Sequence, residues 1–241
     1  MESKPAKVAL VTGASRGIGR AIAVRLARDG FGVLLAGRSA ERLAGTARLV
    51  EDEGVAARSI ACDLAGDDAP RTLATEVASA WGRLDVLVNN AGVAPGGAFE
   101  GCALDDWDRT MAINARAPFF ITQALLPTLR RARPGYVVNI GSVVSKKGYA
   151  NQALYAASKH ALLGWTKALA REVPSDELRV HAVLPGGVDT GMIREMRPDI
   201  DPGELIAPEE IAQVVAELVA MRGNAVIDEV AIRRRRKAAW D

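Results

Sequence analysis

The sequence predicts a single α/β domain in which helices cover both faces of a doubly wound, parallel, seven-stranded sheet. Two observations support this fold class. Short β-branched and apolar runs alternate with longer stretches of helical spacing along the chain. Residues 84–89 form a nearly continuous apolar run, which is typical of a strand buried on both faces. Regular alternation implies right-handed crossovers, and these make the strands parallel.

Each of these runs predicts one element. The expected strands are residues 7–12, 32–36, 58–62, 84–89, 136–140, 179–184 and 226–232. The expected helices are residues 17–28, 40–53, 69–81, 104–131, 152–171 and 208–221. Pro118 lies inside the fourth of these helices, and we expect it to kink that helix because proline lacks the N–H group that a helix interior needs.

Length and composition limit the class of protein. The chain has 241 residues, and no repeat, linker or low-complexity stretch divides it, so we assign residues 1–241 to one domain with a basic tail at 233–241. Lys and Arg number 31 against 29 Asp and Glu, a balance that does not indicate a nucleic-acid binder. The sequence shows no signal peptide and no apolar run of about 18 residues. We therefore expect a cytoplasmic protein that does not enter the membrane and whose two cysteines are reduced.

A glycine-rich turn, residues 12–19 (TGASRGIG), connects the first strand to the first helix. Glycine lets the backbone approach a ligand closely, and the free N–H groups at the start of a helix bind phosphate. The residues expected to bind a dinucleotide here are Gly13, Ser15, Arg16, Gly17, Ile18 and Gly19. The alternative is a purely structural turn, since glycine-rich turns occur in many α/β proteins.

The end of the second strand indicates which dinucleotide is bound. An acidic residue at this place would accept hydrogen bonds from a ribose 2′-hydroxyl, but residues 36–39 (AGRS) contain no carboxylate. The guanidinium groups of Arg38 and Arg16 are suited to a 2′-phosphate, which favours NADP(H) over NAD(H). The alternative for Arg38 is a solvated loop charge. Asp63, after the third strand, is expected to contact the adenine amino group or to form a turn.

Tyr155 and Lys159 stand four residues apart, on one face of a predicted helix. A tyrosine with an ordinary pKa of about 10 transfers protons poorly at neutral pH, and a neighbouring ammonium group lowers that pKa. Ser142 follows the fifth strand, where its hydroxyl can hold a carbonyl oxygen beside the tyrosine. The three side chains predict a site for proton transfer to or from a carbonyl oxygen.

These residues, in this order, resemble a classical short-chain dehydrogenase/reductase. The similarity extends over about residues 7 to 190 and includes the glycine turn, Asn89-Asn90-Ala91-Gly92, Asn114, Ser142, Tyr155, Lys159, Pro185-Gly186 and Thr190. It implies a Rossmann-type fold with Tyr155 as general acid or base. Lys159 would hold the nicotinamide ribose and lower the tyrosine pKa, and Ser142 would orient the carbonyl. Asn114 would anchor a water in a proton relay to Lys159.

The resemblance also implies contacts with the cofactor. Asn90 would support the backbone on the cofactor side, and Val188 and Thr190 would hold the carboxamide. Beyond the glycine turn, the expected cofactor-binding residues are Arg38, Asp63, Leu64, Asn90, Ala91, Gly92, Tyr155, Lys159, Pro185, Gly186, Val188 and Thr190. For Asn89 and Asn90 a structural role is the alternative, because asparagine is common in caps and turns. No metal site is expected, since neither histidine has a second ligand at suitable spacing.

We therefore expect an NADP(H)-dependent oxidoreductase that transfers hydride between the nicotinamide and a carbonyl or secondary alcohol. The pattern resembles bacterial 3-oxoacyl thioester reductases, and Arg130, Arg131 and Arg171 stand at helix ends where such enzymes meet an acidic acyl carrier protein. The alternatives are a dehydrogenase of small ketones, polyols or sugars, and a non-catalytic protein that senses NADP(H). The resemblance also implies a homo-oligomer, either a dimer or a tetramer.

The C-terminus departs from the family pattern. Many members end their last strand with Asp-Gly-Gly, whereas this chain continues into residues 233–237 (RRRRK). We expect a solvated tail or a subunit contact, and no specific nucleic acid, because five charges neutralise only a few phosphates. An acidic partner or an anionic membrane face is the alternative. Lys146 and Lys147 are expected to be a solvated pair, with attraction of anionic substrates as the alternative.

Overall fold

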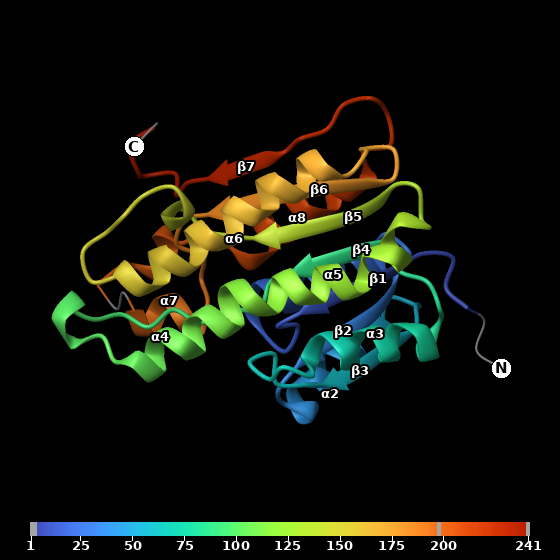
Figure 1. Cartoon of the computed structure of the whole chain (residues 1–241), viewed down its shortest axis with the longest axis horizontal. Helices are drawn as coiled ribbons and strands as arrows, with labels where there is room; N and C mark the ends of the chain where they lie inside the picture. The colour runs from blue at the N-terminus through green and yellow to red at the C-terminus, as the bar shows by residue number, and fades with distance from the viewer. Residues whose placement is uncertain (1–3, 197–198, 240–241) are drawn as a thin grey trace.

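The structure, a computed structural model, describes residues 4–196 and 199–239. Within this part of the chain, seven parallel strands form one sheet (Figure 1). The strands are β1 (Val8–Thr12), β2 (Gly32–Gly37), β3 (Ala57–Ala61), β4 (Val86–Asn89), β5 (Gly135–Ile140), β6 (Leu178–Pro185) and β7 (Glu229–Ile232). Their order in the sheet is β3-β2-β1-β4-β5-β6-β7. The predicted fold class is confirmed, although β4 and β7 begin later than the sequence pattern indicated.

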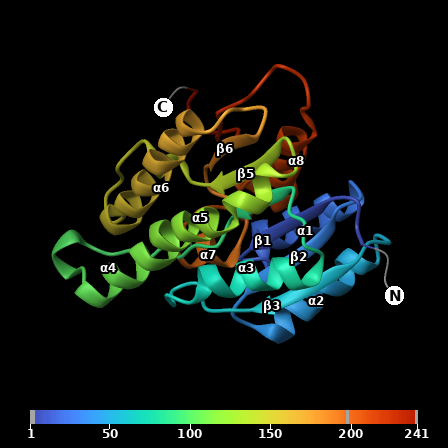
Figure 2. The same ribbon diagram turned by 45° about the vertical axis from the view of Figure 1, so that its right-hand side comes forward.

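Helices cover both faces of the sheet (Figures 1 and 2). One layer contains α1 (Gly17–Arg28), α2 (Ala40–Glu51) and α8 (Pro208–Ala220). The other contains α3 (Ala69–Ala80), α5 (Ala117–Arg130) and α6 (Ala153–Glu172). The remaining described helices are α4 (Leu104–Met111), α7 (Gly191–Met196) and the short 3-10 helices η1 (Phe99–Gly101), η3 (Val143–Ser145) and η4 (Pro202–Glu204). No helix in the described ranges has both the length and the apolar character needed to cross a membrane.

The apolar runs of the sequence form two hydrophobic cores, one on each face of the sheet. In β1, Ala9 and Val11 belong to the core under α1 and α8, while Val8 and Leu10 belong to the core under α3 and α5. All four side chains are completely buried, because successive residues of a strand point to opposite faces. Because helices cover both faces of the sheet, the ends of the strands are left as the place for a functional site.

The helix expected at 104–131 is interrupted near its middle. Between α4 and α5, residues Ala112–Arg116 form a π-helical segment, η2, in which Ala117 N donates to Ala112 O. Pro118 stands two residues after this segment. In a regular α-helix the N–H group of residue 118 would donate to the Asn114 carbonyl, but proline has no N–H group. Where a kink was expected at Pro118, the structure has a π-turn just before the proline, and the buried Asn114 lies inside this turn.

Candidate functional site

A cavity of about 670 Å³ opens at the carboxyl ends of the strands. Its walls come from the segments that follow all seven described strands, from Gly13 after β1 to Arg233 after β7. This is the edge at which open α/β sheets bind ligands. The residues predicted for the site that line it are Gly13, Ser15, Arg16, Gly17, Ile18, Gly19, Arg38, Asp63, Leu64, Asn90, Ala91, Gly92, Ser142, Tyr155, Lys159, Pro185, Gly186, Val188 and Thr190. Of the predicted set, Asn114 alone lies behind the wall.

The glycine turn leaves room that any side chain would fill. Gly13 and Gly17 have φ angles of +66° and +54°, in the left-handed region that favours glycine. A Cβ atom at Gly19 would lie 2.3 Å from the Gly13 carbonyl oxygen. The turn leads straight into the start of α1, where backbone N–H groups point outward. This arrangement provides a cradle for a phosphate group.

Thr12 and Asn90 hold the glycine turn against the loop after β4. The backbone N–H groups of Asn90 and Ala91 donate to Thr12 Oγ1 at 3.0 and 3.1 Å. Asn90 Nδ2 donates to the carbonyl oxygen of Thr12 at 2.9 Å. Asn90 thus has the structural role that we weighed for it, while it also lines the cavity. Thr12 completes this contact and was not singled out from the sequence.

The end of β2 and the segment after β6 carry separate charges in the cavity wall. Arg38 is exposed at the end of β2, and Asp63 accepts a hydrogen bond from Ala65 N at 3.1 Å, so it forms the turn considered as its alternative role. The Arg16 guanidinium lies toward the loop after β6, where a Cβ at Gly191 would be 3.4 Å from its Nη1. Arg194 of α7 forms a two-point ion pair with Asp189, which precedes this helix, at 2.8 and 3.0 Å.

Ser142 begins the short turn η3 after β5. Its hydroxyl oxygen accepts a hydrogen bond from Val144 N at 3.3 Å, and its own N–H donates to Ser145 Oγ at 3.2 Å. The Ser142 side chain also forms a hydrogen bond with the Tyr155 side chain. The serine and tyrosine side chains therefore lie next to each other in the wall of the cavity.

Burial controls the protonation of Tyr155 and Lys159. It raises the pKa of Tyr155 to about 12, although the hydrogen bond with Ser142 acts in the opposite direction. It lowers the pKa of Lys159 to about 8. The sequence pattern predicted a lowered tyrosine pKa, but in the chain by itself the pKa is raised because desolvation by burial outweighs the hydrogen bond with Ser142. Lys159 Nζ lies 5.9 Å from the centre of the Tyr155 ring and donates to Ile140 O at 2.9 Å.

Asn114 supports this pair from behind. Its Oδ1 accepts from Val93 N at 2.9 Å, and its Nδ2 donates to Val93 O at 2.8 Å and to Ser158 Oγ at 2.9 Å. A Cβ at Gly92 would lie 3.3 Å from Asn114 Oδ1 and 3.6 Å from Lys159 Nζ. The asparagine and the lysine thus flank one small space in the wall, and the relay through a water between them stays a prediction.

Sequence reasoning missed a buried polar chain beneath the site. Asn89 Nδ2 donates to Thr122 Oγ1 at 3.0 Å and to Asn139 Oδ1 at 2.8 Å, and Asn139 Nδ2 donates to Thr166 Oγ1 at 2.8 Å. The chain joins the ends of β4 and β5 to α5 and α6. The sequence feature that could have indicated this chain is an asparagine at the end of each of two buried strands, because a buried polar side chain needs a hydrogen-bond partner.

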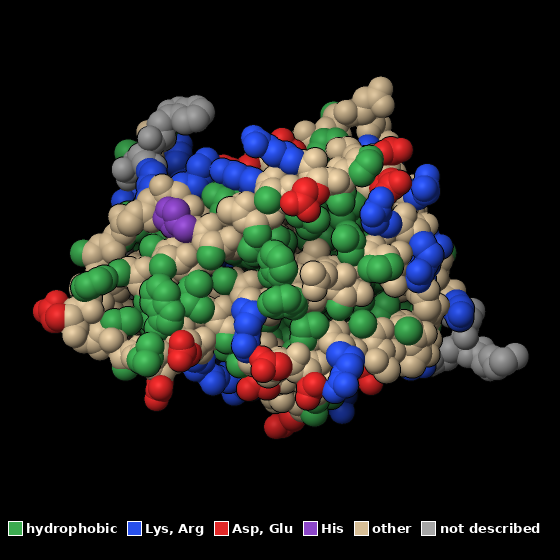
Figure 3. Space-filling model, in the orientation of Figure 1, with side chains coloured by type: hydrophobic (Ala, Val, Ile, Leu, Met, Phe, Trp, Pro, Cys, Tyr) green, Lys and Arg blue, Asp and Glu red, His purple; other side chains and the backbone are tan. Residues whose placement is uncertain are grey.

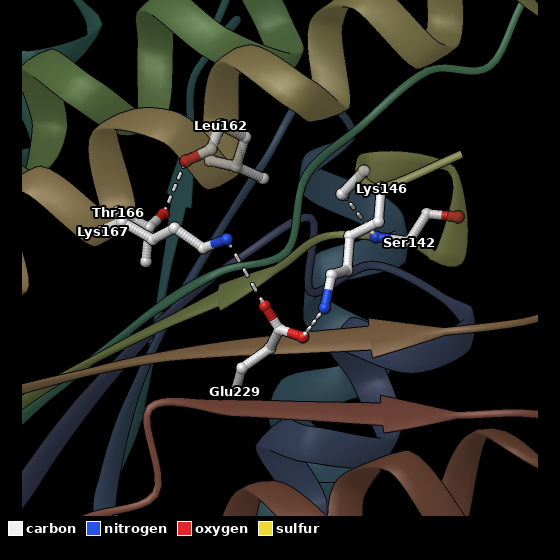
Figure 4. Close-up of polar contacts among 7 residues, drawn as sticks. Ser142, Lys146, Leu162, Thr166, Lys167 and Glu229 are labelled. Atoms are coloured by element: carbon white, nitrogen blue, oxygen red, sulfur yellow. Dashed lines mark hydrogen bonds and ion pairs between the residues drawn. The ribbon is translucent and has the colours of Figure 1, made fainter. Parts of the chain in front are cut away.

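Glu229 of β7 ties the Ser142 turn and α6 together (Figure 4). Lys146 Nζ donates to Glu229 Oε1 at 2.6 Å, and Lys167 Nζ lies 3.8 Å from Oε2. Lys146 is exposed, as expected, its charge is paired with that of Glu229, and it does not line the cavity. The basic run is largely exposed, as expected of a solvated tail, and Arg233, Arg234 and Lys237 also line the cavity.

Known proteins share this fold and sequence pattern. The family model described as short chain dehydrogenase matches residues 7–201. The 3-oxoacyl-acyl-carrier-protein reductases of Aquifex aeolicus and Pseudomonas aeruginosa are 35% and 38% identical, over 93% and 89% of this chain and 94% and 90% of theirs. A short chain dehydrogenase from Burkholderia cenocepacia, solved in complex with NADP, has 38% identity and a TM-score of 0.86 over 94% of this chain and 96% of its own. The chain belongs to the short chain dehydrogenase family and is an oxidoreductase that acts on a carbonyl or secondary alcohol group.

Proposed function

We propose that this protein is an NADP(H)-dependent carbonyl reductase in which Tyr155 protonates the carbonyl oxygen. The observation that carries the proposal is the arrangement of Ser142, Tyr155 and Lys159 beside one cavity that also contains the glycine cradle. A non-catalytic NADP(H) sensor would not need a serine and a tyrosine side chain next to each other in the cavity wall. The reductase is therefore the better account of the site.

The residues present fit a dinucleotide. The cradle of Gly13, Gly17 and Gly19 is closed to any side chain and would hold the pyrophosphate at the start of α1. Asp63 and Leu64 would border the adenine, and Asn90, Ala91 and Gly92 would line the middle. Pro185, Gly186, Val188 and Thr190 would hold the carboxamide end. When bound, the nicotinamide supplies the hydride in reduction and accepts it in oxidation.

Preference for NADP(H) is supported by charge at the end of β2. Arg38 is exposed there, and the described wall of the cavity near it has no carboxylate directly after β2 that would favour an unphosphorylated ribose. The solved relative from Burkholderia cenocepacia was crystallised with NADP. Arg38 would bind the 2′-phosphate through its guanidinium, and Arg16 reaches it only by turning from Gly191.

The protonation states favour the direction of reduction. Because burial raises the pKa of Tyr155 to about 12, the phenol is protonated at neutral pH and can donate to a carbonyl oxygen. Ser142 would hold the same oxygen through its hydroxyl. Lys159, with a pKa of about 8, exchanges protons with solvent at nearly neutral pH. It can therefore restore the tyrosine proton, with Asn114 across the small space beside Gly92 as the anchor of the connecting water.

The first substrate class to test is a 3-oxoacyl thioester, since several relatives at 33–39% identity are 3-oxoacyl-acyl-carrier-protein reductases. Within one chain, Arg130, Arg131 and Arg171 are too far from the cavity to bind an acyl carrier protein while its thioester occupies that cavity. Arg130 pairs with Glu177, whose carbonyl accepts from Gly135 N at the start of β5. These arginines lie near the amino ends of the strands, whereas the cavity lies at the carboxyl ends. A carrier protein would therefore contact the arginines of one subunit while its thioester enters the cavity of another.

An exposed apolar surface supports the expected homo-oligomer. On α4 and α5, Leu104, Trp107, Phe119 and Phe120 are between 41% and 74% exposed, and Phe119 packs edge-on against Trp165 of α6 at 5.7 Å. Figure 3 shows hydrophobic side chains gathered over these three helices. We propose that a second copy of the chain covers this surface. A sedimentation experiment that finds only monomers at micromolar concentration would refute this.

The function is tested by measuring NADPH oxidation by the purified protein with a 3-oxobutanoyl thioester of N-acetylcysteamine, beside simple ketones, diketones and sugars. Turnover of the thioester supports the substrate class. Turnover of other carbonyls alone retains the reductase and replaces that class. Tight NADPH binding without any turnover would instead favour the sensor.

A further inference from the structure

The basic segment after β7 forms part of the wall of the cavity. Gly186 N donates to Ile232 O at 2.7 Å, which fixes the end of β7 beside the loop after β6. Lys237 N then donates to Arg234 O at 3.0 Å and closes a turn. Through this turn Arg233, Arg234, Lys237 and Ala238 line the cavity. In Figure 3, Lys and Arg side chains gather beside the described end of the chain.

These cations lie near the reacting groups and far from Arg38. Ser142 follows β5 and Arg233 follows β7, with only β6 between them. Neighbouring strands are about 4.8 Å apart, so the two chain segments are separated by about 10 Å. Arg38 follows β2, which is five strand positions from β7, or about 24 Å. The tail therefore adds positive charge near Ser142. This charge lies too far from Arg38 to serve in binding a 2′-phosphate.

The contacts within the tail show which of its charges is available. Arg234 and Arg236 share one carboxylate, that of Glu204, at 3.7 and 2.6 Å. Arg233 Nη1 donates to the backbone carbonyls of residues 234, 235 and 237 at 3.3, 3.0 and 2.8 Å. Among the described residues, no carboxylate contacts Arg233. These carbonyls orient the guanidinium while its charge stays uncompensated.

We propose that Arg233 binds an anionic group of the carbonyl substrate, a carboxylate or a phosphate. The inference rests on the proposed function, because it assigns the part of the substrate that lies away from the reacting carbonyl. A guanidinium is suited to both anions, since its planar N–H groups match their oxygens. The segments that contain Ser142 and Arg233 are about 10 Å apart, and the Arg233 side chain lines the cavity. The anionic group of the substrate would therefore be only a few bonds from the reacting carbonyl.

The test compares matched substrates that differ only in charge. One pair is 5-oxohexanoate and its methyl ester, and the other is 5-oxohexyl phosphate and 6-hydroxyhexan-2-one, so that in both pairs the anion lies a few bonds from the ketone. The ratio of kcat/KM between the charged and neutral members is measured in the wild type, in Arg233→Gln and in Arg235→Gln. Arg235 is the matched control, because it is exposed, stands in the same run and does not line the cavity.

We expect at least one charged member to be preferred about tenfold in the wild type and in Arg235→Gln. Arg233→Gln is expected to bring that ratio close to one with an unchanged KM for NADPH, while Arg233→Lys keeps part of it. Preference within the acid and ester pair identifies a carboxylate, and preference within the phosphate and alcohol pair identifies a phosphate. If Arg233→Gln does not fold, added salt must lower kcat/KM of the wild type for the charged member alone.

Equal kcat/KM within both pairs in the wild type would overturn the proposal, as would a ratio that Arg233→Gln leaves unchanged. A rise in the KM for NADPH in that variant, equal for charged and neutral substrates, would place Arg233 on the cofactor instead. In these cases the reductase itself stands, because carbonyl turnover is still observed. Absence of turnover with every carbonyl is the separate result that removes the proposed function and this inference with it.

Discussion

Lys159 Nζ donates a 2.9 Å hydrogen bond to the backbone carbonyl of Ile140, the last residue of β5. The bond joins α6 to the strand end that precedes Ser142, so it fixes Tyr155, one helical turn before the lysine, against the serine turn. It is made by a side chain that is only 4% exposed, in a place where a charged group is poorly hydrated. The lysine is therefore both a structural link and a group whose charge is sensitive to pH.

The pH dependence of reduction should report this charge. Burial lowers the pKa of Lys159 from 10.5 to about 8, so the ammonium form is complete well below pH 8 and is lost as pH rises through that value. If the ammonium restores the tyrosine proton, kcat/KM for the carbonyl at saturating NADPH stays level below pH 8 and falls about tenfold per unit above it. Lys159→Arg, which remains charged, should lack the fall. A level profile up to pH 10 in the wild type would contradict this role.

Removal of the Tyr155 hydroxyl should abolish proton transfer while the cavity persists. Tyr155→Phe keeps the ring, which is 9% exposed and packs with Val144 and Ala156. We expect turnover to fall at least about a hundredfold, with the dissociation constant for NADPH changed by no more than about twofold. Steady-state kinetics and a fluorescence titration measure the two quantities. Turnover near the wild-type rate in a variant that binds NADPH would eliminate the proposed mechanism.

Reversal of the charge at Arg38 should change cofactor choice. Arg38→Asp places a carboxylate at the end of β2, where it repels a 2′-phosphate and can accept from a 2′-hydroxyl. We expect the ratio of kcat/KM for NADPH to that for NADH to drop at least about tenfold. The control is Arg42→Asp, an equal change of net charge at an exposed residue outside the cavity wall. The same ratio in both variants would show that Arg38 does not recognise the phosphate.

Two glycines allow the cradle to be tested against simple helix propensity. At Gly19 a methyl group would meet Gly13 O at 2.3 Å and Asn90 Nδ2 at 2.4 Å, so Gly19→Ala must displace backbone. At Gly45, in α2, nothing lies within 4 Å. We expect Gly19→Ala to lower the free energy of unfolding by about 2 kcal/mol and to weaken NADPH binding at least about tenfold.

Gly45→Ala is expected to raise the free energy of unfolding by about 1 kcal/mol with NADPH binding unchanged, because alanine is the better helix former. Denaturant titrations and NADPH titrations of both variants measure this. NADPH binding by Gly19→Ala that equals that of Gly45→Ala would show that the turn does not hold the cofactor.

The sheet and most of the site were predictable from local sequence patterns. Strands buried on both faces, the glycine turn and the spacing of Tyr155 and Lys159 are properties of a few neighbouring residues. The carboxyl ends of parallel strands then bring these residues together by the geometry of the fold. For this reason the predicted cofactor residues line one cavity although they come from separate parts of the chain.

Features that depend on distant contacts were not predictable. The place of Arg233 follows from the pairing of β7 with β6, which sets Ile232 beside Pro185 and turns the basic run toward the cavity. The pKa of Tyr155 follows from burial, which a list of neighbouring charges does not show. Pro118 signals an interruption in its helix, but whether the chain makes a kink or a π-turn depends on what surrounds Asn114.

Glu229 offers a test of how the serine turn is held. Its carboxylate, 22% exposed, accepts from Lys146 at 2.6 Å at the end of η3 and faces Lys167 of α6 at 3.8 Å. Glu229→Gln keeps the shape of the side chain but removes its charge, so the turn that carries Ser142 loses its link to β7. We expect kcat for the carbonyl to fall about threefold to tenfold, with the KM for NADPH unchanged.

The two lysines separate this effect from a general loss of surface charge. Lys146→Gln breaks the short bond to the turn and should reproduce the loss of kcat, whereas Lys167→Gln removes the longer contact and should have a smaller effect. Steady-state kinetics with a neutral ketone measure the three variants, since a neutral substrate excludes direct attraction by the lysines. If all three variants keep the wild-type kcat, the serine turn is held by its own backbone bonds to Ser145 and Val144, and Glu229 is only a surface link between α6 and β7.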